Sequence, residues 1–90
     1  MRYTVRVLAR PSRQLKTIAQ WWRANRPEAP TLAEDEVLAL IASLDEHPER
    51  GHLAEDGAMR VLVARQTKLL IVYRVRTRAK RVDVFAIRRP

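Results

Sequence analysis

The chain has no cysteine and only two glycines among its 90 residues. Without cysteine it cannot form a disulfide, a thiolate metal site or a cysteine nucleophile. Two glycines are too few for a glycine-rich loop that cradles a phosphate. No apolar run is long enough for a signal peptide or for a helix that crosses a bilayer. These absences predict a cytoplasmic protein with no membrane association.

Intrinsic disorder is also excluded, because 47% of the residues are hydrophobic despite a net charge of +8. A chain of this length forms one domain, so we treat residues 1–90 as a single unit. A domain of this size buries only about 60–65% of its unfolded surface, and its stability is therefore marginal.

Acidic residues are nearly missing from the last third of the chain. Residues 59–90 hold ten basic side chains and one acid, Asp83, whereas residues 31–58 hold eight acids and one base. Charge that is segregated in this way is typical of a surface that meets an anionic partner. We therefore expect the basic segment to bind a phosphate backbone or a carboxylate-rich protein segment.

The N-terminal part predicts a strand followed by a helix. Apolar and polar residues alternate over 3–7, which is the pattern of a half-buried strand. The helix begins at Pro11 or Ser12, since proline fits a first turn and serine can bond its free N–H groups. It ends near residues 25–27, before a proline. Its apolar stripe has helical spacing and consists of Leu15, Ile18, Ala19 and Trp22.

A second helix follows after a linker of about five residues, and a linker this short predicts an antiparallel helix hairpin. Thr31 and Glu34 have the spacing of a capping box at its start. The pattern ends at His47 and Pro48, because proline cannot continue a helix.

Three further segments predict a three-stranded antiparallel meander, because they are joined by short turns. They cover residues 60–64, 69–75 and 82–87, and the middle one is apolar on both faces, as in a central strand. The order of elements is β-α-α-β-β-β. One face of the sheet can bury the helix stripes, so the sequence predicts an α+β fold of two layers: an N-terminal strand, a helix hairpin and the meander.

Several segments of this sequence resemble the ParE branch of the ParE/RelE toxin family. Together they cover nearly the whole chain, in the family's order and spacing. They are Leu15-x-x-Ile18-Ala19-x-Trp21-Trp22, Asn25-Arg26-Pro27-Glu28-Ala29, Leu44-x-x-His47-Pro48-Glu49-Arg50-Gly51, Met59-Arg60-Val61-Leu62, Ile71-Val72-Tyr73-Arg74-Val75 and Val82-Asp83-Val84.

The resemblance implies the toxin half of a type II toxin–antitoxin system, with the same order of elements. ParE-like members poison DNA gyrase and have no accepted catalytic centre, whereas RelE-like members cut messenger RNA on the ribosome without a metal. Both use no cofactor and are silenced by an antitoxin. The late arginine and tyrosine of RelE-like toxins lie beyond the final strand, where this chain has Arg88, Arg89 and Pro90. The resemblance therefore favours gyrase inhibition without catalysis, and the ribosome-dependent endoribonuclease is the alternative.

The gyrase hypothesis assigns no catalytic residue. The nuclease alternative would use Arg60 to bind a phosphate, Tyr73 to assist proton transfer, and Arg88 or Arg89 to stabilise charge. The competing interpretations are structural: Arg60 pairs with a nearby acid, and Tyr73 packs in the core.

The target-binding surface is expected on the basic strands, although a solvated charged face is the simpler interpretation. A third hypothesis, a nucleic-acid-binding module that partners a repressor, depends on the same charges. The basic segment also holds Arg78, Lys80 and Arg81. The residues that we assign to this surface are Arg60, Arg65, Lys68, Arg74, Arg76, Arg88 and Arg89.

Candidates for contact with an acidic antitoxin are Trp21, Trp22 and Arg74. Trp22 fits the apolar stripe, whereas Trp21 lies at its edge, where it either binds a partner or completes the core. No metal site is expected, because the spacing of His47, Glu49, His52 and Asp56 fits no common zinc pattern.

Overall fold

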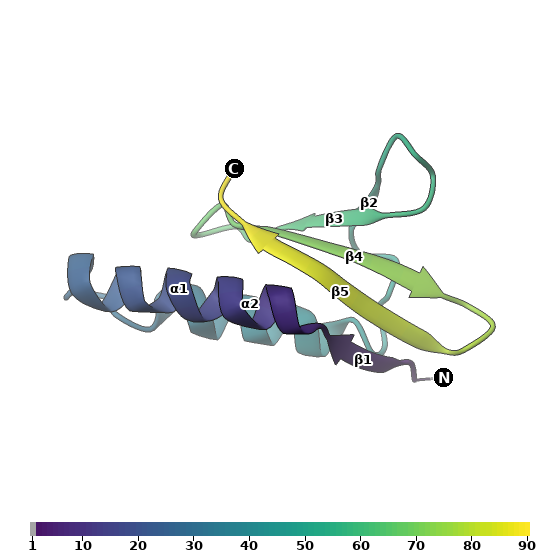
Figure 1. The fold of residues 1–90 in the computed structure, drawn as a ribbon, viewed down its shortest axis with the longest axis horizontal. Coiled ribbons are helices and arrows are strands. Elements are labelled where there is room, and N and C mark those ends of the chain that lie inside the picture. The colour runs from purple at the N-terminus through teal and green to yellow at the C-terminus, as the bar shows by residue number, and fades with distance from the viewer. Residues whose placement is uncertain (1) are drawn as a thin grey trace.

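The computed structural model describes residues 2–90 and shows a helix hairpin packed on one face of a five-stranded sheet (Figure 1). The α+β class and the two layers are as predicted. The elements are β1 (Thr4–Val7), α1 (Ala9–Asn25), α2 (Leu32–Ser43), β2 (His52–Leu53), β3 (Arg60–Val63), β4 (Leu70–Arg76) and β5 (Arg81–Arg88).

The strand order in the sheet is β1-β5-β4-β3-β2, so the predicted meander of β3, β4 and β5 forms its centre. Strand β1 pairs with β5 in parallel, and the long connection that parallel pairing needs runs through the helix hairpin and strands β2, β3 and β4. The count of strands was wrong by one, because β2 lies in the predicted loop 48–57 and pairs with β3. Both β2 side chains are exposed, so no alternation in the sequence reveals this strand.

Helix α1 begins at Ala9, two residues before Pro11. A proline is tolerated in the first turn because the N–H groups there have no partner within the helix. The helix ends at Asn25, as predicted, and the Arg26 N–H bonds to the carbonyl of Trp22. Among residues 2–90, no helix has both the length and the apolar character that a bilayer crossing requires.

Helix α2 begins directly after Thr31, as predicted, but the bond at its start and the position of its end differ from the prediction. The capping box is wrong, because the Thr31 hydroxyl oxygen accepts no bond from the helix backbone: Thr31 has φ −108° and ψ 5° instead of the extended backbone typical of an N-cap. Its hydroxyl donates to the Asp35 carboxylate at 2.9 Å. The helix ends at Ser43, four residues before His47. The N–H of Leu44 bonds to the carbonyl three residues back, which tightens the chain and stops the α-helical pattern.

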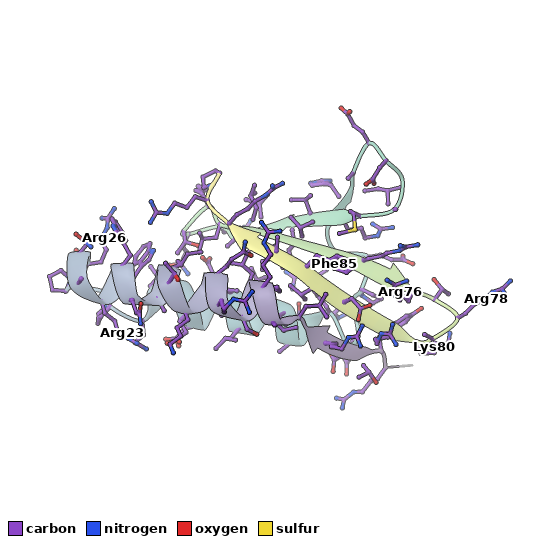
Figure 2. All side chains as sticks on the ribbon, viewed as in Figure 1. Arg23, Arg26, Arg76, Arg78, Lys80 and Phe85 are labelled. Carbon is purple, nitrogen blue, oxygen red and sulfur yellow. The ribbon has the colours of Figure 1, made fainter. Side chains whose placement is uncertain are left out.

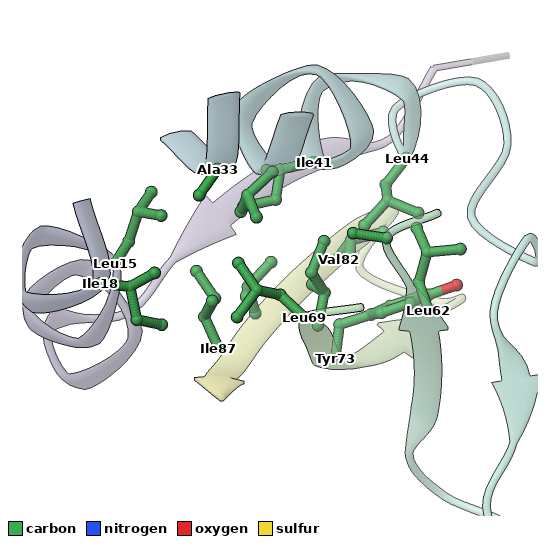
Figure 3. Packing of buried hydrophobic residues seen from close by; sticks show 14 residues of the cluster. Leu15, Ile18, Ala33, Ile41, Leu44, Leu62, Leu69, Tyr73, Val82 and Ile87 are labelled. Atoms are coloured by element: carbon green, nitrogen blue, oxygen red, sulfur yellow. The ribbon is translucent and has the colours of Figure 1, made fainter. Parts of the chain in front are cut away.

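The core lies between the helix hairpin and the face of the sheet that it covers (Figure 3). Trp22 packs against its edge, as the stripe predicted. Alternate residues of the central strands enter this core from one face only, which is the expected period of two. The buried side chains include Leu15, Ile18, Val37, Ile41 and Leu44 from the helix layer and Leu62, Ile71, Tyr73, Val82, Val84 and Ile87 from the sheet.

The opposite face of the sheet, which we call the open face, has no helix over it (Figure 1). On β4 it carries Leu70, Val72, Arg74 and Arg76, because their neighbours Ile71 and Tyr73 point into the core. Cross-strand register adds β5 residues to this face, with Arg74 opposite Asp83 and Arg76 opposite Arg81. The part of the open face near β3 therefore carries the apolar side chains Leu70 and Val72, and the part near β1 carries the charged ones.

Candidate functional site

The charged end of the open face is organised around one carboxylate, Asp83. Its side chain is 0% exposed although it lies on a face without helices, because three arginine side chains cover it. Arg76 donates from Nε to Oδ2 at 2.7 Å, and Arg81 and Arg6 donate from Nε to Oδ1 at 2.9 and 3.1 Å. We call these four residues the arginine cluster.

The electrostatics of the arginine cluster favour the ionised form of Asp83. Burial alone would raise the pKa of this carboxyl, but the hydrogen bonds from Arg76, Arg81 and Arg6 outweigh that effect and lower the pKa from 3.8 to about 2. Three guanidinium groups and one carboxylate leave a net charge of +2 at this point of the sheet. The cluster is therefore cationic and also held in a fixed geometry.

The pairing geometry leaves donors available in the cluster. Arg6 and Arg76 each contact Asp83 through Nε alone. Within residues 2–90, their terminal guanidinium nitrogens have no hydrogen-bond partner. The Arg6 side chain is 53% exposed and the Arg76 side chain is 36% exposed, so these nitrogens can bind a ligand from solvent.

Arg6 is a member of the cluster that the charge pattern of the last third could not indicate. It belongs to β1, and the parallel register of β1 with β5 places it opposite Asp83. The one available signal was the isolated acid in a strongly basic segment, since a lone carboxylate among arginines is a natural centre for pairing.

Arg60 and Tyr73 lie opposite each other on the covered face and bind the backbone of the loop after α2. Arg60 donates from Nη1 to the carbonyl of Gly51 at 2.8 Å and to that of Glu49 at 3.4 Å. The Tyr73 hydroxyl donates to the carbonyl of Pro48 and accepts from the N–H of Gly51, both at 2.8 Å. Arg60 therefore contacts loop carbonyls and not the expected acid.

Tyr73 occupies the core position that was the simpler interpretation, with 0% of the residue exposed. Burial raises the pKa of its hydroxyl above 10.0, although the Gly51 N–H and the nearby Arg60 act in the opposite direction. A Cβ at Gly51 would lie 2.8 Å from the Tyr73 hydroxyl oxygen, so glycine is needed for this close approach.

The structure does not bring the four residues of the nuclease alternative together. Arg60 and Tyr73 are on the covered face, whereas Arg88 is opposite Leu70 on the open face. Arg89 lies with its guanidinium carbon 5.4 Å from the centre of the Trp21 ring. These positions form no common catalytic arrangement.

The seven basic residues assigned to a target-binding surface also separate into groups. Arg74, Arg76 and Arg88 lie on the open face. Arg65 and Lys68 lie in the turn between β3 and β4. Arg60 donates to the loop after α2, and Arg89 lies over the Trp21 ring. The open face therefore keeps only part of the predicted surface, and it gains Arg6 and Arg81.

The two tryptophans line a hollow between α1 and the end of the chain, which we call the tryptophan groove. Trp21 is 40% exposed, and its ring lies 6.3 Å from that of Trp22 in an edge-to-face arrangement. Arg74 is on the open face of the sheet and takes no part in this groove. The groove is lined by Ile18, Trp21, Trp22, Thr67, Leu69, Arg89 and Pro90.

A second hollow continues the tryptophan groove along α1, and the two share Ile18 and Arg89. Its rim carries Arg10 and Arg13. The combined surface has an apolar floor and a basic rim, which suits an amphipathic acidic segment.

The described part of the chain contains no cluster of side chains that could bind a metal ion. Across residues 2–90, no three His, Asp or Glu side chains gather in a way that could hold a metal ion. Asp56 accepts hydrogen bonds from the backbone N–H groups of Ala58 and Met59, which shapes the turn before β3.

Comparison with known proteins identifies the class to which this chain belongs, the toxins of type II toxin–antitoxin systems. The family model described as "ParE toxin of type II toxin-antitoxin system, parDE" matches residues 5–89. The chain therefore belongs to the ParE toxin family. No curated protein sequence matches it.

Two solved structures share the fold. A chain of the chromosomal ParDE toxin–antitoxin system from P. aeruginosa superposes with a TM-score of 0.82 at 17% identity, over 97% of this chain and 95% of that one. A double arginine-to-alanine mutant of the E. coli toxin RelE, in the free state, gives a TM-score of 0.64 at 19% identity, over 99% and 84% of the two chains. At these identities the similarity establishes the fold alone.

Proposed function

We propose that this ParE-family toxin arrests growth by inhibiting DNA gyrase and is neutralised by a cognate antitoxin. The observation that carries the proposal is the family match over residues 5–89. The position of Tyr73 adds support against the nuclease alternative, because both hydrogen bonds of its buried hydroxyl go to backbone groups. A proton-transfer group must reach the reacting atoms, and this one faces the core.

The direct test is the supercoiling of relaxed plasmid by purified gyrase, with increasing amounts of toxin. We expect loss of supercoiling and an accumulation of cleaved plasmid, and we expect both to be reversed by the antitoxin. Unchanged supercoiling at saturating toxin would exclude gyrase as the target.

A parallel experiment separates the nuclease alternative. Primer extension on translated messages from cells that express the toxin should reveal no new 5′ ends within codons. Ends that appear only when the message is translated would instead support a ribosome-dependent endoribonuclease.

The antitoxin segment that we propose for the tryptophan groove is amphipathic and acidic. Its apolar side chains would cover Trp21 and the floor at Ile18 and Leu69, and its carboxylates would meet Arg10, Arg13 and Arg89 on the rim. Aromatic and arginine side chains in one groove are the residue types that dominate the energy of protein interfaces.

Calorimetry with the product of the neighbouring antitoxin gene tests this placement. Trp21→Ala should weaken binding by about tenfold or more. Leu38→Ala is the matched control, since Leu38 is also exposed, at 49%, but lies on α2 away from the groove. Equal losses for the two variants would place the antitoxin elsewhere.

A further inference from the structure

We infer that the arginine cluster on the open face is a binding site for the phosphate backbone of duplex DNA, and that Asp83 is its positioning residue. The inference is independent of gyrase as the toxin's target, because it concerns direct contact between the toxin and DNA. Asp83 holds each guanidinium of the cluster through Nε, and the terminal nitrogens of Arg6 and Arg76 remain free.

The neighbouring residues extend the cluster into a cationic row. Arg74 and Arg76 leave the same face of β4, and side chains two residues apart on a strand are separated by about 6.6 Å. That distance is comparable with the separation of neighbouring phosphates along one nucleic-acid strand. Arg74, Arg76 and Arg78 line a common hollow formed by residues 74–79. Figure 2 shows Arg76, Arg78 and Lys80 at the same end of the molecule, far from Arg23 and Arg26.

Asp83 is a carboxylate within a surface that we propose to bind anions, and its role there is to fix the arginine side chains before the ligand binds. A free arginine loses side-chain entropy when it binds, and this loss costs part of the binding energy. Asp83 neutralises one of the three positive charges, but it also fixes the orientation of the three guanidinium groups. Less side-chain entropy is therefore lost when these groups bind a phosphate. Guanidinium groups with fixed orientation suit the bidentate geometry of a phosphate.

A phosphate backbone fits this end of the sheet better than an acidic peptide does. Protein interfaces need apolar anchors, whereas interfaces with DNA are polar and strongly basic. The large apolar side chains that residues 2–90 leave exposed are Trp21, Leu38, Leu53 and Val63, and none belongs to the cluster. Single-stranded nucleic acid is also a poor match, because its sites combine basic grooves with aromatic stacking platforms. Phe85, two residues after Asp83 on β5, is half-buried and so offers little ring surface for stacking.

Fluorescence anisotropy with a short labelled duplex and the full-length toxin measures the predicted binding. If Arg6, Arg74 and Arg76 each contact one phosphate, the affinity should fall about 40-fold between about 50 and about 200 mM salt. Arg6→Gln should lower the slope of log K against log salt by about 0.9. Arg26→Gln is the matched control, since it removes the same charge at the opposite end of the molecule (Figure 2). Equal slopes for the two variants, or no binding at low salt, would overturn the inference.

Asp83→Asn tests the positioning role, because a pure effect of net charge predicts the opposite sign. The substitution raises the net charge from +8 to +9, which by itself would strengthen binding to DNA. If Asp83 positions the guanidinium groups, the variant binds DNA more weakly than the wild type, by about fivefold. Tighter binding would refute positioning. Circular dichroism confirms that the variant is folded, and if it is not, Asp83→Glu serves as the second variant, with weaker binding again expected because the longer side chain displaces the arginines.

Two competitors identify the class of partner. Polyglutamate should compete much less effectively than unlabelled duplex at equal charge concentration. Equal competition would show that the cluster recognises carboxylates and would remove DNA as its ligand. A single strand that binds more tightly than the duplex of the same length would overturn the choice of duplex DNA.

Discussion

The two faces of the sheet use charged side chains in different ways. On the covered face, charge holds the backbone: Arg60 binds loop carbonyls, and Glu36 of α2 accepts from the N–H groups of Gln66 and Thr67 in the turn before β4. On the open face, charged side chains bind one another around Asp83 and keep donors toward solvent. A count of basic residues therefore mixes two roles, which only the fold separates.

The largest expected effect contrasts the two faces directly. Tyr73→Ala removes a fully buried ring and two hydrogen bonds to the loop after α2. We expect a loss of about 3–5 kcal/mol in the free energy of unfolding. Val72→Ala changes the neighbouring residue on the open face, where the side chain is half-buried, and should cost about 1 kcal/mol or less. Urea unfolding followed by circular dichroism measures both. Similar losses would mean that the open face is packed as tightly as the core.

The next effect concerns the carboxylate that holds the β3–β4 turn. Glu36 accepts three hydrogen bonds from Gln66 and Thr67, at 2.7–3.0 Å. Glu36→Ala should cost about 1–2 kcal/mol, because water can replace the carboxylate only in part. Glu34→Ala is the control from the same helix, since its ion pair with Arg23 is exposed and should contribute about 0.5 kcal/mol or less. Thermal unfolding compares them, and a Glu36 loss no larger than the Glu34 loss contradicts the assigned role.

Periodicity in the sequence predicted the features that one element carries by itself. Leu15 and Ile18 are in the core, and each end of the three central strands lies within one residue of its predicted position. Helix spacing and strand alternation are local properties, so a single segment contains the signal. The capping box failed because Thr31 does not adopt the extended backbone that would let its hydroxyl oxygen accept from a helix N–H group.

Features that depend on pairing between distant segments could not be predicted in this way. The parallel contact of β1 with β5 has no local signature, and the membership of Arg6 in the arginine cluster depends on it. The hydroxyl of Tyr73 is a similar case, because its two partners lie in the loop after α2, more than 20 residues away in sequence. A period of two places the ring in the core and says nothing about what the oxygen meets.

The last prediction uses pH to isolate the open face, and we expect its effect to be smaller because the arginines around Asp83 are partly exposed to salt and water. The pKa of Asp83 is about 2 in the folded protein, below its ordinary value of 3.8. As the pH falls below 3.8, the unfolded chain therefore takes up a proton before the folded one does. The contribution of this carboxylate to stability is complete above pH 3.8 and is lost as the pH approaches 2.

Asp83→Asn removes this titration and leaves the carboxylates of the covered face in place. The pKa of Glu36 is also lowered, since the hydrogen bonds from Gln66 and Thr67 outweigh the upward effect of burial. Wild type and variant thus share the Glu36 contribution, and the difference between their unfolding free energies reports Asp83 alone. That difference should shrink as the pH falls from 3.8 toward 2, and high salt should reduce it at neutral pH. A difference that stays constant with pH would show that Asp83 holds the arginines by shape and hydrogen bonding, without a contribution from its charge.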